Sequence, residues 1–293
     1  MTSLSRVSRK VGDGKGFISN EDMNTLGSIR AEQAAPTVSG KYRMYKTEDV
    51  VKVLGENGWL PVMAQEQRAV KVDNEGFQKH LVRFRMAEQS ALTQVGDVLP
   101  EMILVNSHNG TSAYTFMAGL FHLACLNGLI VSDATVASIR IRHVGYNSEE
   151  VIEATKQITS NVPKIMGKVG LFKSIPLNLD ESLAFAESAL IAKFAEDDSK
   201  VEHPEYGYLS IDDRYFSTKN LVNPYRAADE AKNLWNVLNI VQEKLLTGSR
   251  FEIAKGRRVR VRGITSINEN VRVNRALWHL AEEMARIKTN TVA

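Results

Sequence analysis

Residues 101–131 read EMILVNSHNGTSAYTFMAGLFHLACLNGLIV, and the rest of the fold is predicted around this stretch. Its start, residues 102–105, is a short apolar run of the kind that forms a buried strand. The polar residues 106–112 are typical of a turn that can cap a helix. The apolar residues that follow recur at the spacing of one helix face, and Asn127-Gly128 is a suitable helix end. The stretch therefore predicts a strand, a turn, a buried helix over residues 113–126 and a second strand.

Further elements on both sides of this stretch set the fold class. Upstream, residues 59–66, 68–72 and 77–86 are predicted as strands, and residues 48–54 as a short helix. Downstream, residues 135–144 and 257–262 alternate like strands. Four helices are predicted in the second half of the chain, at residues 147–163, 180–194, 225–246 and 270–288. The expected fold is α+β, with a central antiparallel β-sheet packed on the buried helix and a mostly helical C-terminal half.

The same patterns predict the domain organisation. Residues 1–40 hold few large apolar side chains, so we expect a flexible N-terminal arm. Residues 41–288 are predicted to form a single α+β domain. Within it, residues 41–146 are the sheet-plus-helix core and residues 147–288 are the helical part, which includes the basic strand near 257–262.

The central stretch also carries a family resemblance. Asn-Ser-x-x-Gly-Thr followed by Cys-x-Asn-Gly-Leu is found at Asn106, Ser107, Gly110, Thr111, Cys125, Asn127, Gly128 and Leu129. This pattern resembles a phage- and plasmid-borne family of domains of unknown function, number 932 in that series. Residues 234–244 and 274–278 are similar to the C-terminal end of the same family, so the resemblance covers about residues 40–285. It implies a mobile genetic element as the setting, and it brings no settled activity.

Composition limits where the protein acts and what it binds. The 293 residues are 43% hydrophobic, which is enough for a sizeable core. The single cysteine excludes an internal disulfide framework, and there is neither an apolar run of membrane-spanning length nor a signal peptide at the start. We therefore expect a cytoplasmic protein that forms homo-oligomers and has no membrane partner. The net charge of +3 is too small to indicate a nucleic-acid partner unless the charge is concentrated.

Basic residues recur on one face of three predicted strands. Strand alternation separates Lys79, Arg83 and Arg85 from the apolar face, and it does the same for Arg140 and Arg142. An antiparallel sheet often turns charge to solvent, which is the plain alternative. However, residues 250–275 hold eight basic groups and two glutamates, a concentration that favours a phosphate-backbone partner. The predicted nucleic-acid-binding residues are Lys79, Arg83, Arg85, Arg140, Arg142, Arg257, Arg258, Arg260 and Arg262.

The turn of the central stretch is a second candidate site. Free amides at a helix N-terminus favour an anion, so the turn and the helix after it could hold a phosphate. The alternative is a turn whose side chains only satisfy backbone groups. The candidate residues are Asn106, Ser107, His108, Asn109, Gly110, Thr111 and Asn127. We expect no metal site and no cofactor, because His122 and Cys125 lack further ligands and no nucleotide-binding loop is present.

The expected function is binding of nucleic acid without catalysis, with single-stranded DNA favoured, in recombination, annealing or replication of a phage or plasmid. The predicted β-β-β-α order is similar to the core of ring-forming single-strand annealing proteins, an analogy of fold alone. One alternative is a counter-defence or other host-interaction protein that binds an acidic partner. A third hypothesis is a metal-dependent nuclease that uses His108.

Overall fold

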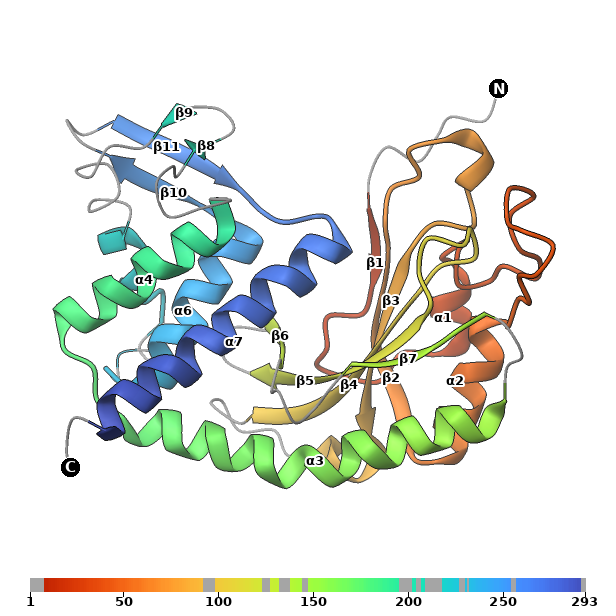
Figure 1. The fold of residues 1–293 in the computed structure, drawn as a ribbon, viewed down its shortest axis with the longest axis horizontal. Helices are drawn as coiled ribbons and strands as arrows, with labels where there is room; N and C mark the ends of the chain where they lie inside the picture. The colour runs from red at the N-terminus through yellow and green to blue at the C-terminus, as the bar shows by residue number, and fades with distance from the viewer. Residues whose placement is uncertain are drawn as a thin grey trace. The chain divides into compact units, whose positions relative to one another are not determined.

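The structure is a computed structural model of residues 1–293. It describes residues 8–91, 98–122, 127–131, 138–143, 147–194, 202–203, 207–208, 218–226, 230, 232–253 and 257–290 (Figure 1). Contacts within the chain divide it into two compact units, residues 1–163 and 164–293. The sequence predicts one domain whose parts meet at residues 146/147, and the division between the two compact units lies further along the chain, inside the helix Ser148–Ser174.

Unit 1 is built on a seven-stranded sheet in which every neighbouring pair is antiparallel. The strand order is β1-β2-β3-β4-β5-β6, and β7 also pairs with β5. All nine residues of β4 are buried, so this strand is the centre of the unit. The strands are β1 (Arg9–Val11), β2 (Trp59–Glu66), β3 (His80–Met86), β4 (Val98–Asn106), β5 (Tyr114–His122), β6 (Asn127–Ile130) and β7 (Ile139–Ile141).

The helices of unit 1 are short up to residue 147. They are α1 (Asn20–Asn24), α2 (Thr47–Glu56) and the 3₁₀ helices η1 (Val72–Asn74) and η2 (Ala87–Ala91). Helix α2 packs against β2 through one buried stripe that includes Val50, Val51 and Leu54. This stripe follows the helical period, so the apolar residues of α2 face the core and its charged residues face outward.

The α+β class, the antiparallel sheet and the helical second half are confirmed, and one central prediction is wrong. Residues 114–122 form β5 and not a buried helix. They pair along their length with β4, from Val105↔Thr115 to Val98↔His122. Both faces of β5 are buried, and such a strand is apolar throughout instead of alternating. The β-β-β-α order on which the likeness to annealing proteins rested is therefore absent. Residues 68–72, expected to form a strand, are not part of one either.

Residues 8–40 are also more ordered than the sequence indicates. β1 pairs with β2 from Arg9↔Glu66 to Val11↔Ala64. Helix α1 begins with a capping box in which the Ser19 hydroxyl accepts from the Asp22 amide while the Asp22 carboxylate accepts from the Ser19 amide. Met23, Leu26, Ile29 and Ala35 are buried. The flexible arm expected for residues 1–40 is therefore not found in residues 8–40, and residues 1–7 lie outside the described part.

Helices dominate unit 2. They are α3 (Ser148–Ser174), whose second half lies in this unit, α4 (Leu179–Phe194), α6 (Leu234–Thr247) and α7 (Ile267–Asn290). α4, α6 and α7 pack on one another (Figure 1), and Trp235 of α6 and Trp278 of α7 are both buried. Two small antiparallel pairs complete the unit: β8 (Glu202–His203) with β9 (Gly207–Tyr208), and β10 (Gly248–Ile253) with β11 (Arg257–Arg262).

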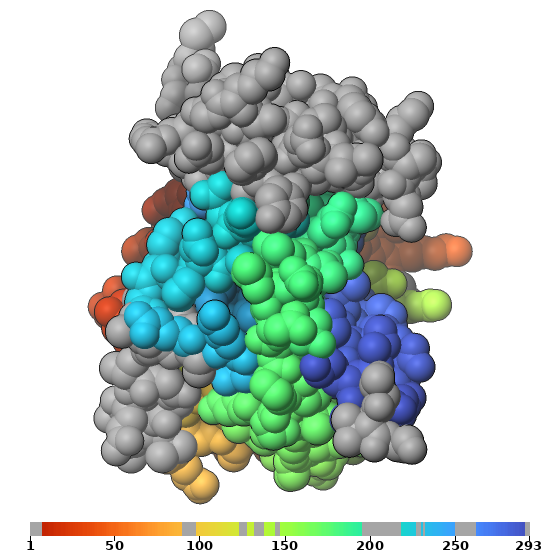
Figure 2. All heavy atoms as spheres, turned by 90° about the vertical axis from the view of Figure 1, so that its left-hand side faces the viewer, coloured from red at the N-terminus to blue at the C-terminus, as the bar shows by residue number. Residues whose placement is uncertain are grey.

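The predicted helices of the second half are found with two changes of boundary. α3 continues through Pro163, where the sequence predicts an end. α6 starts at Leu234, capped by the side chain of Asn233, and not near residue 225. Figure 2 shows a face of unit 2 on which α4 (green) lies between residues 218–226 (cyan) and α7 (blue).

Candidate nucleic-acid interface and the buried clusters around it

Arg83 and Arg85 are buried, although the sequence places them on the solvent side of β3. Both guanidinium groups bind the carboxylate of Glu101 on β4: Arg83 Nε lies 2.5 Å from Oε2, and Arg85 NH2 lies 2.7 Å from Oε1. Arg85 also donates to the carbonyl oxygen of Gly14 at 2.8 Å and lies over the ring of Phe121. These two arginines are part of the interior of unit 1 and are not available to a phosphate backbone.

Two glycines leave room for the Arg83 guanidinium. A Cβ at Gly128 would lie 1.5 Å from Arg83 NH1, and a Cβ at Gly119 would lie 2.6 Å from the side chain of Ile103 and 3.2 Å from Arg83 NH2. Gly128 belongs to the Asn-Gly-Leu part of the motif, which was expected to end a helix. Its observed role is to let an arginine lie flat against strand β6.

Replacing Gly128 with alanine is expected to lower the free energy of unfolding by about 1–3 kcal/mol, because the added methyl group displaces a guanidinium that the Glu101 carboxylate holds. Chemical denaturation followed by circular dichroism measures the change. Gly167→Ala is the control, since nothing lies within 4 Å of a Cβ at this position of α3 and alanine favours helix. Equal stability of the Gly128 variant and the unmodified protein would contradict this role.

The face of the sheet that carries Arg83 and Arg85 also carries basic side chains that reach solvent. We call these side chains the basic strip; they are Lys10, Lys79, Arg140 and Arg142. Lys10, Arg140 and Arg142 are exposed, and Lys79 is half-buried. Strand register places Arg140 on this face: Arg140 of β7 pairs with Thr115 of β5, which pairs with Val105 of β4. The strip contains the predicted residues Lys79, Arg140 and Arg142, and it adds Lys10 from β1.

Two members of the basic strip, Lys79 and Arg140, interact electrostatically. Burial lowers the pKa of Lys79, and the positive charge of Arg140 lowers it further. Partial desolvation of the Lys10 side chain lowers its pKa, and so does the charge of Arg83, while Asp13 and Glu101 act in the opposite direction. Among the described residues, Arg140 and Arg142 have no ion-pair partner. The strip therefore carries a positive potential that an anionic partner would neutralise.

The hairpin formed by β10 and β11, which we call the basic ribbon, is the second basic element. Its register sets Arg250 opposite Arg260 and Glu252 opposite Arg258. Strand alternation places residues 250, 252, 258, 260 and 262 on one face. Arg262 is exposed, and the side chains of Arg257, Arg258 and Arg260 lie outside those that are described.

The family-motif turn is buried in a cluster of three histidines. Asn106, Ser107 and His108 are 0% exposed. The Thr47 hydroxyl of α2 lies 2.8 Å from His80 Nε2 and 3.0 Å from His108 Nε2, so it joins β3 to the turn. Asn106 Oδ1 lies 3.0 Å from Nε2 of His143, whose ring stacks on Tyr42 with centroids 4.4 Å apart.

Hydrogen bonding assigns a neutral tautomer to each histidine. His80 Nδ1 faces the Gln78 carbonyl oxygen at 3.4 Å and must carry its proton, so His80 Nε2 accepts from Thr47. The same hydroxyl then accepts from His108 Nε2, which leaves His108 Nδ1 as an unpaired acceptor, as observed. His143 Nε2 faces two oxygen acceptors and donates, and its Nδ1 also lacks a partner.

Burial is the first cause of the low basicity of the cluster. It lowers the pKa of His80 to about 4 and that of His108 to about 2, and it also lowers the pKa of His143. The neighbouring histidines lower the values of His80 and His108 further. The cluster therefore stays neutral near pH 7 and ties α2, β3, the turn after β4 and the segment after β7 together.

The phosphate site predicted at the motif turn is not supported, because no helix follows it. The exposed part of the turn is closed locally: Asn109 Oδ1 accepts from the amide of Thr111 at 3.2 Å and from its hydroxyl at 2.6 Å. The Ser107 hydroxyl accepts from the Ser112 amide at 2.9 Å. These are the contacts of a structural turn. The last motif candidate, Asn127, pairs through its backbone with His122, and its side chain lies outside those that are described.

Sequence reasoning missed Lys10, Thr47, Glu101, His80 and His143. The one usable signal was Glu101, a lone carboxylate in an otherwise apolar run, since such a charge needs a buried partner. Thr47, His80 and His143 gave no signal because they come from segments far apart in the sequence. Within the ranges that the structure describes, no group of three or more histidine, cysteine or acidic side chains is arranged to hold a metal ion. No described helix is both long enough and apolar enough to cross a membrane.

Comparison with known proteins identifies relatives along most of the chain. Residues 35–278 match the family described as "Domain of unknown function (DUF932)". Two proteins of Escherichia coli (strain K12) are similar over 265 residues, 90% of this chain and 90% of each relative. They are the UPF0380 protein YafZ, at 30% identity, and the UPF0380 protein YfjQ, at 29%. No solved structure matches. Because the match spans residues 35–278, which is most of the chain, this chain belongs to the DUF932 family.

Proposed function

We propose that this protein binds nucleic acid without catalysing a reaction, using the basic strip of unit 1 and the basic ribbon of unit 2. The observation that carries the proposal is that strand register sets exposed Arg140 on the face of the sheet that also carries Lys79, whose pKa the positive charge of Arg140 lowers. A polyanion removes this repulsion by supplying phosphates and releasing its own counterions. The resemblance to phage and plasmid proteins makes recombination or replication of a mobile element the expected setting.

Single-stranded DNA is the partner that this arrangement favours. The basic strip lies across strand ends of a sheet, and sheet surfaces are the elements with which several modules follow one strand of nucleic acid. On the ribbon, alternate residues of β11 repeat every ~6.8 Å, and strand alternation predicts that positions 258, 260 and 262 share one face in one row. A row of this kind follows a flexible phosphate backbone without reading the bases.

The test is fluorescence anisotropy of labelled single- and double-stranded oligonucleotides at several salt concentrations. The strip variant carries Lys79→Glu, Arg140→Glu and Arg142→Glu, and the ribbon variant carries Arg258→Glu, Arg260→Glu and Arg262→Glu. Each is expected to bind more weakly and to show a shallower salt dependence, by about 0.7 in the logarithmic slope for each lost phosphate contact.

The control carries Lys41→Glu, Lys52→Glu and Lys156→Glu, three exposed positions of unit 1 with the same change in net charge. It is expected to retain most of the affinity and the original salt slope. Equal loss of binding in the control and in both test variants would show that net charge alone is responsible. If neither oligonucleotide binds even at low salt, the proposal fails, and an acidic protein becomes the partner to test.

A further inference from the structure

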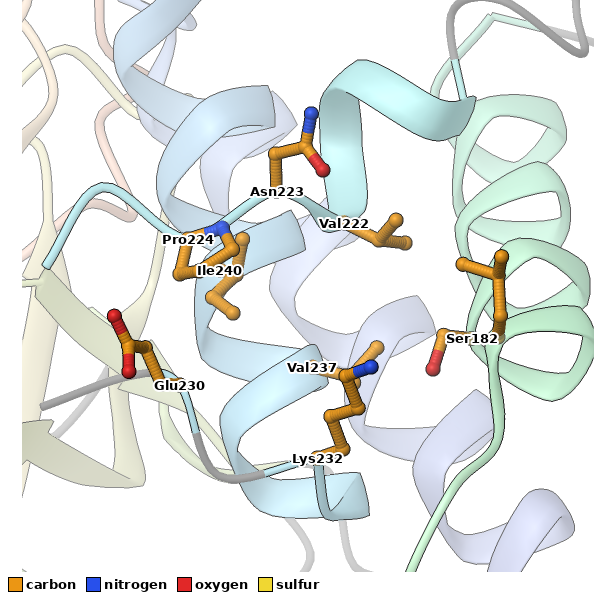
Figure 3. Close-up of a pocket in the computed structure, with 9 residues that line it drawn as sticks. Ser182, Val222, Asn223, Pro224, Glu230, Lys232, Val237 and Ile240 are labelled. Atoms are coloured by element: carbon orange, nitrogen blue, oxygen red, sulfur yellow. The ribbon is translucent and has the colours of Figure 1, made fainter. Parts of the chain in front are cut away.

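Unit 2 contains a cavity of about 420 Å³ that is separate from both basic surfaces. Its lining comes from the start of α4, the segment 222–224, the residues before α6, and α6 itself (Figure 3). Apolar side chains make most of the wall, and a few polar groups interrupt it, which is the usual character of a small-molecule site. The lining residues are Leu179, Ser182, Val222, Asn223, Pro224, Glu230, Lys232, Val237 and Ile240.

The wall formed by residues 222–224 is held firmly against α6. Lys244 of α6 is 2% exposed, and its ammonium donates to the carbonyl oxygens of Asn220 and Asn223. It also lies 4.4 Å from the ring centroid of Tyr225. Arg226 binds the carboxylate of Glu243 with both terminal nitrogens, one of them at 2.8 Å. Burial lowers the pKa of Lys244 to about 8, because removing its ammonium from water disfavours the charged form. The two carbonyl oxygens of the segment replace part of that hydration.

On the opposite side of the cavity, where Lys232 is exposed, backbone hydrogen bonds hold the residues next to the start of α6. The Leu177 amide donates to the Lys232 carbonyl oxygen at 3.0 Å, and the Leu234 amide donates to that of Ile175 at 2.9 Å. The side chain of Asn233 caps α6 in between. A cavity with walls held from both sides binds a ligand without first losing conformational entropy.

The polar groups of the cavity differ in charge and position. Figure 3 shows the Lys232 ammonium and the Ser182 hydroxyl turned toward the same space, with Val222 and Val237 beside them. In the described part of the chain, no side chain or carbonyl group is bonded to the Lys232 ammonium. The Ser182 hydroxyl donates to the Asn178 carbonyl oxygen at 2.7 Å and can still accept a hydrogen bond. Glu230 stands at the far end of the lining in this view.

We propose that this cavity binds an apolar monocarboxylate, with the carboxylate at Lys232 and the hydrocarbon against Leu179, Val222, Val237 and Ile240. One ammonium group satisfies one carboxylate, whereas a phosphate dianion would require more donors than the cavity offers. Glu230 at the other end repels a second acidic group, so a dicarboxylate is disfavoured. The site uses none of the residues assigned to nucleic-acid binding, and either proposal can fail while the other holds.

The test compares octanoate, octan-1-ol and octylamine as probes, using isothermal titration calorimetry and methyl NMR spectra of the full-length protein. Octanoate is expected to shift the methyl signals of Val222, Val237 and Ile240 with saturation. Its affinity is expected to exceed that of the alcohol and the amine by about tenfold or more, the effect of one charge-assisted contact.

Two variants locate the site. Lys232→Met is expected to remove the preference for octanoate over octan-1-ol, and Leu179→Trp, at a 54% exposed position on the rim, to weaken all binding by filling the cavity. Lys164→Met is the matched control, an exposed lysine of α3 outside the cavity. The proposal is overturned if octan-1-ol binds as tightly as octanoate, if the three methyl groups do not respond, or if Lys232→Met and Lys164→Met behave alike.

Discussion

Glu101→Gln is expected to destabilise unit 1 by about 3–5 kcal/mol, because it leaves two buried guanidinium groups with no negative charge between them. The side chains of Arg83 and Arg85 are only 7% and 3% exposed, so water cannot replace the lost carboxylate. Domains have a total stability of about 5–15 kcal/mol, so this single change should come close to unfolding the sheet. Hydrogen exchange of peptides from β3, β4 and β5 measures the effect in unit 1 separately from unit 2.

The control and a rescue variant separate charge from packing. Glu88→Gln makes the same chemical change at an exposed position of η2, and it should leave exchange of the sheet unaltered. Adding Arg83→Met to Glu101→Gln removes one of the two uncompensated charges and should recover part of the lost stability. If the double variant is less stable than Glu101→Gln alone, the carboxylate acts through packing and this electrostatic account is wrong.

Acidification from pH 7 to pH 5 is expected to destabilise unit 1 by about 2 kcal/mol through His80 alone. Burial keeps the folded-state pKa of His80 at about 4, below its usual value of 6.5. Between these two values the unfolded chain binds a proton that the folded chain does not, so stability falls as the pH falls. His108 acts in the same direction, because its folded-state pKa is also lowered. A proton added at its Nδ1 would find no hydrogen-bond acceptor nearby.

Urea unfolding at several pH values measures the loss. His80→Gln keeps a neutral hydrogen-bonding group beside Thr47 and should flatten the pH dependence, even if it lowers stability at pH 7. His279→Gln, at an exposed position of α7, is the control for the loss of a histidine. A titration of His80 near pH 6.5 in NMR spectra of the folded protein would contradict the buried neutral cluster.

The sequence predicted those elements whose pattern has one buried face. α2 and α4 were found near their predicted positions because capping and stop residues mark them, and α7 because a stripe of apolar residues repeats with the helical period. β2 and β3 were found because turn residues enclose them. The segment 114–122 was misread because both of its faces are buried, and a continuous apolar run also satisfies helical spacing. Tertiary pairing with β4 decides between the two, and no local pattern reports that pairing.

The candidate site was predicted in part for the same reason. Alternation correctly set Lys79, Arg83, Arg85 and Arg140 on one face of the sheet, but it cannot say where that face meets water. Lys79 precedes β3 and Arg140 lies on the short strand β7, and both reach solvent, whereas Arg83 and Arg85 lie within β3 and meet Glu101 on β4. The histidine cluster could not be predicted, because its contacts join residues far apart in sequence, such as Thr47 with His108 and Tyr42 with His143.

Helix α3 carries the boundary between the two units within a single element. Its first half buries Val151, Ala154 and Ile158, and in its second half Phe172 meets Trp278 while Lys168 binds Glu282. Pro163 stands at the boundary and has no amide hydrogen to donate, so the helix lacks one backbone hydrogen bond at that turn. If one unit unfolds locally, the unfolding of α3 can therefore stop at this turn, where one backbone hydrogen bond fewer joins the two halves of the helix. The chain has a built-in stopping point between two cooperative blocks, although the helix itself is continuous.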